Sequence, residues 1–545
     1  MQRTVTLLIF LLCFQLGTAR ADHLRDLQQA AIRDGKADWG HWGPRPDRYS
    51  SWQQHTNRLI PIYSFGMTLD TVDGANSVYH DAARIKRLYG RLPEETLNPA
   101  AKYFDQTAIY QLQKQAADAG KKYIVLLIFD GMDWQTTQAA SIALSERVGY
   151  DQGRGSGLHI QDYRGAETDF GYFVTSPHNH GTQWNVDAQT VTNIGGKYRG
   201  GYAAGLGGNT PWSTPTDPLY IIGQSRKIRH AYTDSAASAT SMNSGIKTYN
   251  RAVNVDFEGH QVVPISRQLQ AQGRAIGVVT SVPVSHATPA CAYGNNVARY
   301  DYQDISRDLL GLRSVAHKTT PLPGVDVLLG AGWGHTAQAQ KGQGANYVPG
   351  NVYLSKADLD RINLRHGGGY VVVQRKPGIN GNLALMAAAR EAREQKTRLF
   401  GMFGVGDQRG SHLPYRTADG RYNPTDGVHA PAEPYRRADI FENPTLADMT
   451  RAALEVLGQH AGGFWLMVEA GDVDWANHTN NIDNSVGAVK SGDDAFRVIT
   501  DWIERHDAWS DAVVLVTADH GHYLQLDRPE RLIDPAAKNR GSSDP

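Results

Sequence analysis

Short apolar runs constrain the fold of this chain more than any other feature of its sequence. The four strongest are rich in β-branched or aromatic residues and are bounded by polar segments: Tyr123–Phe129, Ile276–Thr280, Phe464–Val468 and Ala512–Thr517. Val325–Leu329 and Arg398–Phe403 are weaker candidates. Runs of this length and composition are typical of strands that are buried on both faces, so we expect a largely parallel sheet.

Helical patterns lie between or before these runs, for example over Thr107–Ala119, Ala384–Gln395 and Thr445–Gln459. Strands that alternate with helices predict an α/β fold, with a doubly wound, mostly parallel central sheet and helices on both of its faces. The chain has 545 residues. That length is enough for one large domain of this kind or for a few average domains.

The first residues have the features of a signal peptide. Arg3 supplies a positive start, Leu7 to Leu16 form an apolar run, and Ala19-Arg20-Ala21 offers the small residues of a cleavage site. The run is too short to span a bilayer comfortably, although an uncleaved anchor is the alternative. We expect residues 1–21 to be removed, which predicts a secreted or periplasmic protein without a membrane segment.

Two regions differ in composition from the rest of the chain. Residues 22–120 precede the first strong strand and carry Trp39, Trp42 and Trp52 in a polar setting. Residues 150–228 are rich in Gly, Tyr, Thr and Asn, as is typical of a surface insert. We therefore predict an N-terminal arm over 22–120 and an α/β domain over 121–545 that contains the insert.

Charge and cysteine content exclude some classes of protein. Lys+Arg and Asp+Glu number 55 each, so bulk charge does not favour a nucleic-acid partner. Cys13 would leave with the signal peptide, and Cys291 would then be the one cysteine of the mature chain. No internal disulfide is then expected, and the fold must rely on its core. Cys291 lies among small and apolar residues, which favours packing over reactivity.

Acidic residues follow three of the four strong runs, at Asp130, at Glu469 and at Asp519 with His520. In open α/β sheets, ligand sites form at the carboxyl ends of the strands. The sequence therefore predicts a chemical site at this edge of the sheet.

The segment Tyr232–Thr240 (YTDSAASAT) places Ser235 among small residues at the expected start of a helix. Small side chains would let a phosphate approach the backbone N–H groups, and a helix N-terminus favours an anion. Ser235 is therefore a candidate nucleophile, which would need activation. The alternative is an ordinary helix cap followed by an alanine-rich helix.

Two further segments combine acids with histidine. In EAGDVDWANH, Asp474 and His478 are four residues apart and would share one face of a helix, as zinc ligands can. The alternative for this segment is a solvated junction between a loop and a helix. Asp519 and His520 directly follow an apolar run and also suit zinc.

Taken in chain order, YTDSAASATSMNSGIKTYN, EAGDVDWANH and VTADHGH resemble the alkaline phosphatase family. VLLIFDGMDW and SHATPACAYGNNVAR resemble two further segments of that family, so the similarity extends from about residue 123 to 525. The resemblance implies that residues 121–545 form a catalytic domain that hydrolyses small phosphate monoesters through a phosphoserine, with two zinc ions and one magnesium ion. The family is often dimeric, so a homodimer is a further option.

The resemblance also implies roles for individual residues. Ser235 matches the nucleophile, Arg299 matches the residue that clamps the phosphate, and His522 matches a position near the substrate cleft. The implied magnesium ligands are Asp130, Thr288 and Glu469, with His286 close by. Asp130 is implied to bridge one zinc and the magnesium. The other implied zinc ligands are Asp519 and His520 for the ion that touches Ser235, and Asp474 and His478 for the outer ion.

One ligand of the family pattern has no counterpart in its usual place. The family's outer zinc takes a third ligand from a histidine far downstream of the Asp-His pair, but 23 residues follow His522 here and none is a histidine. We expect a histidine from the body of the chain to replace it, first of all His178 or His180, because the insert begins between the first metal ligand and the nucleophile. His412 and His429 are other donors, and water is the alternative.

Two other functions stay open at this point. A phosphodiesterase of the same superfamily could use the insert to shape a larger cleft. A non-catalytic relative that binds metal or phosphate would be consistent with the missing histidine. A sulfatase is disfavoured because the residues after Ser235 lack the proline and arginine that surround a sulfatase nucleophile.

Overall fold

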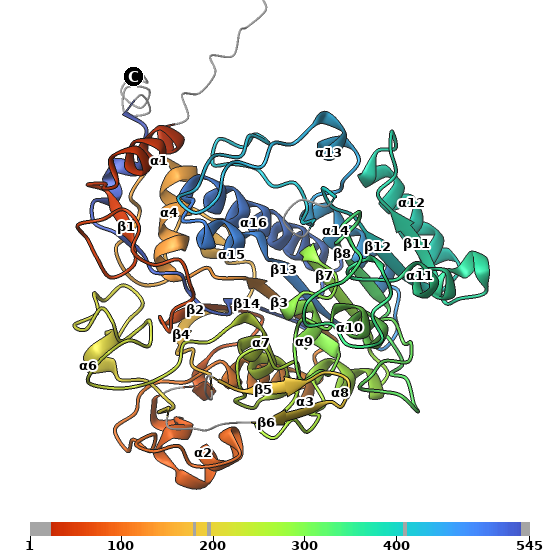
Figure 1. The fold of residues 1–545 in the computed structure, drawn as a ribbon, viewed down its shortest axis with the longest axis horizontal. Coiled ribbons are helices and arrows are strands. Elements are labelled where there is room, and N and C mark those ends of the chain that lie inside the picture. The colour runs from red at the N-terminus through yellow and green to blue at the C-terminus, as the bar shows by residue number, and fades with distance from the viewer. Residues whose placement is uncertain (1–22, 73, 178–180, 193–197, 407–410, 536–545) are drawn as a thin grey trace, which may run out of the picture.

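Nine strands of the described chain form one central sheet (Figure 1). The computed structural model describes residues 23–535 apart from 73, 178–180, 193–197 and 407–410, so the predicted signal peptide lies outside the described residues. Across the sheet the strands are β11 (Tyr370–Gln374), β12 (Arg398–Met402), β8 (Val327–Ala331), β7 (Ala275–Pro283), β13 (Phe464–Ala470), β3 (Tyr123–Phe129), β14 (Ala512–Ala518), β2 (Ile60–Phe65) and β4 (Thr168–Phe173). The strands from β11 to β14 are parallel, β2 is antiparallel to β14, and β4 is antiparallel to β2. The predicted mostly parallel sheet is confirmed, and all six predicted runs overlap its strands.

Helices cover both faces of the sheet (Figure 1). On one face lie α3 (Thr107–Asp118), α7 (Ser235–Ser244), α8 (Ile265–Ala271) and α9 (Ala287–Tyr293). On the other lie α4 (Trp134–Ser145), α12 (Gly381–Glu394), α14 (Leu446–Leu457) and α16 (Ile482–Arg505). The three predicted helices correspond to α3, α12 and α14 and are confirmed. Among the described residues, no helix is both long and apolar enough to cross a membrane.

Smaller elements surround these layers. The other α-helices of the described residues are α1 (His23–Asp34), α2 (Ala82–Tyr89), α5 (His159–Asp162), α6 (Ala204–Gly207), α10 (Tyr302–Leu309), α11 (Lys356–Ile362), α13 (Arg437–Phe441) and α15 (Asp472–His478). Three strand pairs lie outside the main sheet: β1 (Gly40–Trp42) with β15 (Leu524–Leu526), β5 (Gln183–Asn185) with β6 (Thr190–Thr192), and β9 (Thr336–Ala337) with β10 (Gly350–Asn351).

The central strands are buried on both faces, which explains why they are continuous apolar runs in the sequence. Every residue of β13 and β14 is buried, and so is every residue of β3 except Tyr123. Cys291 is also fully buried, and this burial raises the pKa of its thiol to about 12. A thiol in that state is unreactive, as expected of a packing residue.

Both compositionally distinct regions contribute a strand to the main sheet. Residues 22–120 supply β2, and residues 150–228 supply β4. Because β2 is antiparallel to β14, its first residue lies at the edge where the parallel strands end. The domain boundary at residue 120 stays a prediction, but the segment before β2 has direct access to that edge.

Candidate active site

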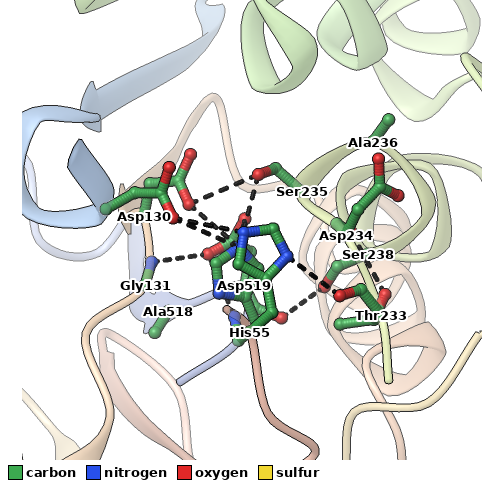
Figure 2. A network of polar contacts seen from close by, with 12 residues as sticks. His55, Asp130, Gly131, Thr233, Asp234, Ser235, Ala236, Ser238, Ala518 and Asp519 are labelled. Atoms are coloured by element: carbon green, nitrogen blue, oxygen red, sulfur yellow. Dashed lines mark hydrogen bonds and ion pairs between the residues drawn. The ribbon is translucent and has the colours of Figure 1, made fainter. Parts of the chain in front are cut away.

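Three adjacent strands bring acidic residues to one edge of the sheet. β13 and β14 both pair with β3 up to its last residue, Phe129. Asp130 and Asp519 therefore leave their strands at the same level, and the backbone N–H of Gly131 donates to Asp519 Oδ1 over 2.9 Å (Figure 2). Glu469 is the penultimate residue of β13. The acids that follow the apolar runs thus meet in space.

Ser235 faces these acids from the first position of α7. Asp234 caps the helix, because its carboxylate accepts from the backbone N–H of Ala237 over 2.9 Å. The Ser235 hydroxyl lies 3.4 Å from Asp130 Oδ1 and 3.3 Å from His520 Nε2 (Figure 2). A buried serine hydroxyl at a helix N-terminus is placed where an anionic group would be stabilised.

Asp130, Asp519 and His520 form the first candidate metal cluster, and all three are buried. His520 Nε2 lies 3.2 Å from Asp130 Oδ1 and 3.4 Å from Asp519 Oδ2. Burial and the nearby Asp474 raise the pKa of Asp130, and burial and Asp130 raise that of Asp519. A cation between these carboxylates would offset the unfavourable burial of their charge.

His55, Asp474 and His478 form a second cluster beside the first. Nε2 of His55 lies 3.1 Å from Nε2 of His478, and each lies 3.4 Å from Asp474 Oδ1. Ligand atoms around a tetrahedral zinc are about 3.3 Å apart when each is about 2.0–2.1 Å from the ion. The three atoms therefore form a triangle of the size that one metal ion requires.

The Nδ1 contacts of His55 and His478 determine which nitrogen of each ring carries the proton. His55 Nδ1 donates to the carbonyl of Thr233 over 3.0 Å. His478 Nδ1 donates to the carbonyl of Gln53 over 2.7 Å. Because a carbonyl can only accept, both rings carry their proton on Nδ1 and direct an Nε2 lone pair toward the other. Two such lone pairs cannot form a hydrogen bond with each other, but both can bind the same cation.

His522 completes the surroundings of Asp474. Its Nε2 donates to Asp474 Oδ1 over 2.6 Å, and the ring is fully buried. Burial alone would raise the pKa of Asp474, but His478, His522 and His55 outweigh it and hold that pKa well below its usual range. Asp474 is therefore an ionised acceptor oriented by His522.

The position of His55 follows from the direction of β2. Thr56, one residue later, donates its N–H to the carbonyl of Gly521 over 2.8 Å and so continues the pairing of β2 beyond the end of β14. The rings of His55 and His520 stack with their centroids 3.7 Å apart. The histidine beside Asp474 and His478 therefore comes from the segment just upstream of β2, and our sequence analysis missed it.

Two of the other predicted histidine donors, His412 and His429, lie in the described part of the chain, where each ring contacts a different partner. His178 and His180 lie outside the described residues. His412 Nε2 is 2.5 Å from Glu433 Oε2, and His429 Nε2 is 3.1 Å from Asn480 Oδ1. Both rings are thus held by partners other than Asp474 and His478, and neither His412 nor His429 belongs to a candidate metal cluster of the described residues.

Asp130, Thr288 and Glu469 bring oxygen atoms close together, because Glu469 interacts both with the Thr288 hydroxyl and with the charge of Asp130. Asp130 Oδ2 and Glu469 Oε1 are buried and make no hydrogen bond within the described residues. Burial raises the pKa of Glu469 to about 7, although the hydroxyls of Thr280 and Thr288 act to lower it. Oxygen atoms of this kind fit magnesium, which prefers carboxylate, hydroxyl and water ligands.

A cavity of about 470 Å³ opens over Ser235, and Arg299 lines it. Arg299 donates from Nη1 to Asp234 Oδ2 over 3.1 Å and from Nη2 to His286 Nε2 over 3.3 Å. Burial and Arg299 lower the pKa of His286 to about 3, so this ring is neutral and can accept. His286 therefore positions Arg299 and packs edge-on against Trp475, with ring centroids 5.8 Å apart.

Comparisons with known proteins find alkaline phosphatases among the relatives of this chain. The alkaline phosphatase family model matches residues 207–532. The chain is 31% identical to alkaline phosphatase H of Pseudomonas aeruginosa over 350 residues, or 60% of this chain and 67% of that one. It is 27% identical to alkaline phosphatase 4 of Bacillus subtilis over 307 residues, 56% and 50% of the two chains. The crystal structure of Thermus thermophilus alkaline phosphatase matches with a TM-score of 0.44 and 22% identity, over 74% of this chain and 60% of that one.

The chain thus spans between half and two thirds of the length of these relatives. The family match extends from residue 207 to 532, which includes Ser235, Arg299, Asp474 and His520. The family match begins after His55, so the position of His55 beside Asp474 and His478 is known from the structure alone. This chain belongs to the alkaline phosphatase family.

Proposed function

We propose that this protein hydrolyses phosphate monoesters by transferring the phosphoryl group to Ser235 and then to water. The observation that carries this proposal is the position of Ser235. Its hydroxyl lies at a helix N-terminus, within 3.4 Å of Asp130 and His520, on the wall of a cavity that also holds Arg299.

The ligand clusters support the binding of metal ions at three places. We propose one zinc ion at Asp130, Asp519 and His520, and a second at His55, Asp474 and His478. We propose a magnesium ion at Asp130, Thr288 and Glu469. When bound, such ions activate a hydroxyl or water as nucleophile and stabilise the charge that develops on the attacking and leaving oxygens.

The side chains of the protein then act on the phosphate itself. The Ser235 hydroxyl gives up its proton as its oxygen attacks phosphorus, so that the Oγ–P bond forms, the bond to the ester oxygen breaks, and the leaving oxygen takes up a proton and departs as the alcohol. The planar guanidinium of Arg299, oriented by Asp234 and His286, binds two non-reacting phosphate oxygens. The first N–H groups of α7 favour the same negative charge. Water then attacks phosphorus, the Oγ–P bond breaks, and Ser235 regains its proton.

Export of the protein is part of the proposal. The charged start, apolar run and small-residue site over 1–21 support removal of a signal peptide and action outside the cytoplasm.

Chelation tests the proposed function directly. We expect the purified protein to hydrolyse 4-nitrophenyl phosphate, to lose this activity in a chelator, and to regain it when zinc and magnesium are restored. Hydrolysis that is unchanged after exhaustive chelation would contradict the proposal. Faster hydrolysis of bis(4-nitrophenyl) phosphate than of the monoester would favour a phosphodiesterase instead.

Replacing Arg299 with alanine should weaken phosphate binding. A hydrogen bond to a charged group contributes about 1.5–3 kcal/mol, and about 1.4 kcal/mol corresponds to a factor of ten. We therefore expect the inhibition constant of inorganic phosphate to rise at least about tenfold. Arg91→Ala is a matched control, because Arg91 stacks on Phe257 away from the cavity. Unchanged inhibition in Arg299→Ala would place Arg299 outside the phosphate site.

A further inference from the structure

We propose that Arg251, held between Trp184 and Tyr300 at the mouth of the catalytic cavity, binds a second anionic group of the substrate. This inference rests on the proposed function and specifies the substrate class: phosphate monoesters whose leaving group carries a further phosphate or carboxylate. All three residues line the cavity that contains Ser235 and Arg299.

Arg251 has a backbone conformation that is unusual for a residue with a long side chain. Its φ of 81° lies in the left-handed region, which glycine adopts freely and residues with a side chain rarely adopt. Its N–H donates to Asp234 Oδ1 over 3.0 Å, and its carbonyl accepts from the N–H of Arg299 over 2.8 Å. The two contacts tie Arg251 to the cap of the nucleophile helix and to the phosphate-binding arginine. Glycine would satisfy this backbone, so the arginine side chain requires a separate explanation.

Two aromatic rings hold that side chain over the cavity. The guanidinium carbon of Arg251 lies 5.2 Å from the centroid of the Trp184 ring and 5.5 Å from that of Tyr300. These cation–π contacts restrict the guanidinium without occupying its N–H donors. Within the described chain, no carboxylate lies at ion-pair distance from this exposed guanidinium. Its donors are therefore available to a ligand.

The hairpin that carries Trp184 is attached to the segment that leads to Arg299. Gln189, in the loop between β5 and β6, donates from its side chain to Asn296 Oδ1 over 3.2 Å. The carbonyl oxygen of the same side chain accepts from the N–H of Val297, also over 3.2 Å. These contacts place one wall of the cavity on the insert, so the insert contributes to substrate recognition.

Two arginines thus lie at different depths of one cavity. Arg299 is buried, paired with Asp234, and placed beside the nucleophile. Arg251 is exposed at the mouth and pairs with rings. Because a guanidinium binds carboxylate or phosphate through two parallel N–H donors, the outer arginine fits an anion on the leaving group while the inner one binds the transferred phosphoryl group. A neutral leaving group would not use the outer site.

The test compares two esters that differ by one anionic group, propyl phosphate and propane-1,3-diyl bisphosphate, in the metal-loaded enzyme. The ratio of their kcat/KM values measures selectivity, and a factor of two is expected from the two equivalent ends of the bisphosphate. At low ionic strength we expect kcat/KM of the wild type for the bisphosphate to be about twentyfold that for propyl phosphate, which is about ten times the factor of two. The ratio should fall toward two in Arg251→Gln and in Arg251→Gly, the second of which keeps a residue suited to the backbone conformation.

Arg416→Gln is the matched control, since Arg416 is also exposed and stacked on a ring, that of Tyr422, but lines a different cavity. It removes the same charge and should keep the wild-type ratio. An unchanged ratio in both Arg251 variants would overturn the subsite, as would an equal fall in Arg416→Gln. The Arg251 variants could instead lose kcat/KM for phenyl phosphate relative to propyl phosphate while the bisphosphate ratio stays unchanged. That result would overturn the anion subsite and indicate that the site stacks on an aromatic leaving group. If the wild-type enzyme hydrolyses neither propyl ester, the proposed function itself fails.

Discussion

Replacing Ser235 with alanine will lower the turnover of 4-nitrophenyl phosphate by about 10⁴-fold or more, as removal of a catalytic nucleophile does in other hydrolases. The fold should persist, because alanine is the smaller residue and Ser235 begins a helix that is already capped by Asp234. Steady-state kinetics with circular dichroism on the same sample would check both expectations.

Ser241→Ala is a matched control for this variant. Ser241 is a buried serine of the same helix, and its hydroxyl donates to the carbonyl of Ala237 rather than toward the acids. We expect its turnover to stay close to that of the wild type. If Ser235→Ala retains more than a few per cent of wild-type turnover, or if Ser241→Ala loses as much, Ser235 is not the nucleophile.

Replacing His55 with alanine will weaken the zinc site that it shares with Asp474 and His478 and leave the other two proposed metal sites in place. His55 supplies one corner of the triangle with Asp474 and His478, and two protein ligands remain without it. Loss even of an outer partner of a metal ligand costs about 10–100-fold in metal affinity, so loss of a direct ligand should cost at least about 100-fold. Metal analysis after dialysis should find one tightly bound zinc fewer per chain, with turnover lowered in parallel and partly restored by excess zinc.

The double variant His178→Ala plus His180→Ala separates the two sources of the third ligand. If His55 is that ligand, the double variant should keep the metal content of the wild type. If the double variant loses a zinc ion while His55→Ala keeps both, the insert supplies the ligand and our assignment of His55 is wrong. His366→Ala, at an exposed ring far from the site in the chain, controls for nonspecific binding.

The edge of the sheet that carries the acids could be predicted because its strands are buried on both faces. Such strands are continuous apolar runs, so the point at which each run ends is visible in the sequence. Asp130 directly follows one of these runs and Asp519 follows another after Ala518, and the structure pairs their two strands side by side. The sheet, its mostly parallel order and the meeting of these acids followed from that pattern.

His55 could not be predicted in the same way because it precedes an apolar run instead of following one. β2 is antiparallel, so the residues before it, rather than those after it, lie at the carboxyl edge of the other strands. The available signal is the run Leu59–Phe65, which has a histidine four residues upstream. Pro61 and Ser64 interrupt the run and weaken it as a strand pattern.

The place of Arg251 beside the cavity could not be predicted from the sequence for a different reason. Trp184 lies in β5, whereas Arg251 and Tyr300 lie in two separate loops, and no local spacing relates the three residues. Their proximity depends on how the hairpin of the insert attaches to the segment before Arg299. Contacts of this kind are set by tertiary packing, whereas strand ends are set by local periodicity.

The most direct measurement of the central claim is the location of the transferred phosphoryl group. The metal-loaded enzyme is mixed with excess 4-nitrophenyl phosphate, quenched in acid at several times, digested and analysed by mass spectrometry for phosphopeptides. The account predicts a phosphate on Ser235 that appears during turnover and is absent from the Ser235→Ala variant. A phosphate on another residue, or no phosphopeptide at any quench time while the substrate is being hydrolysed, would contradict it.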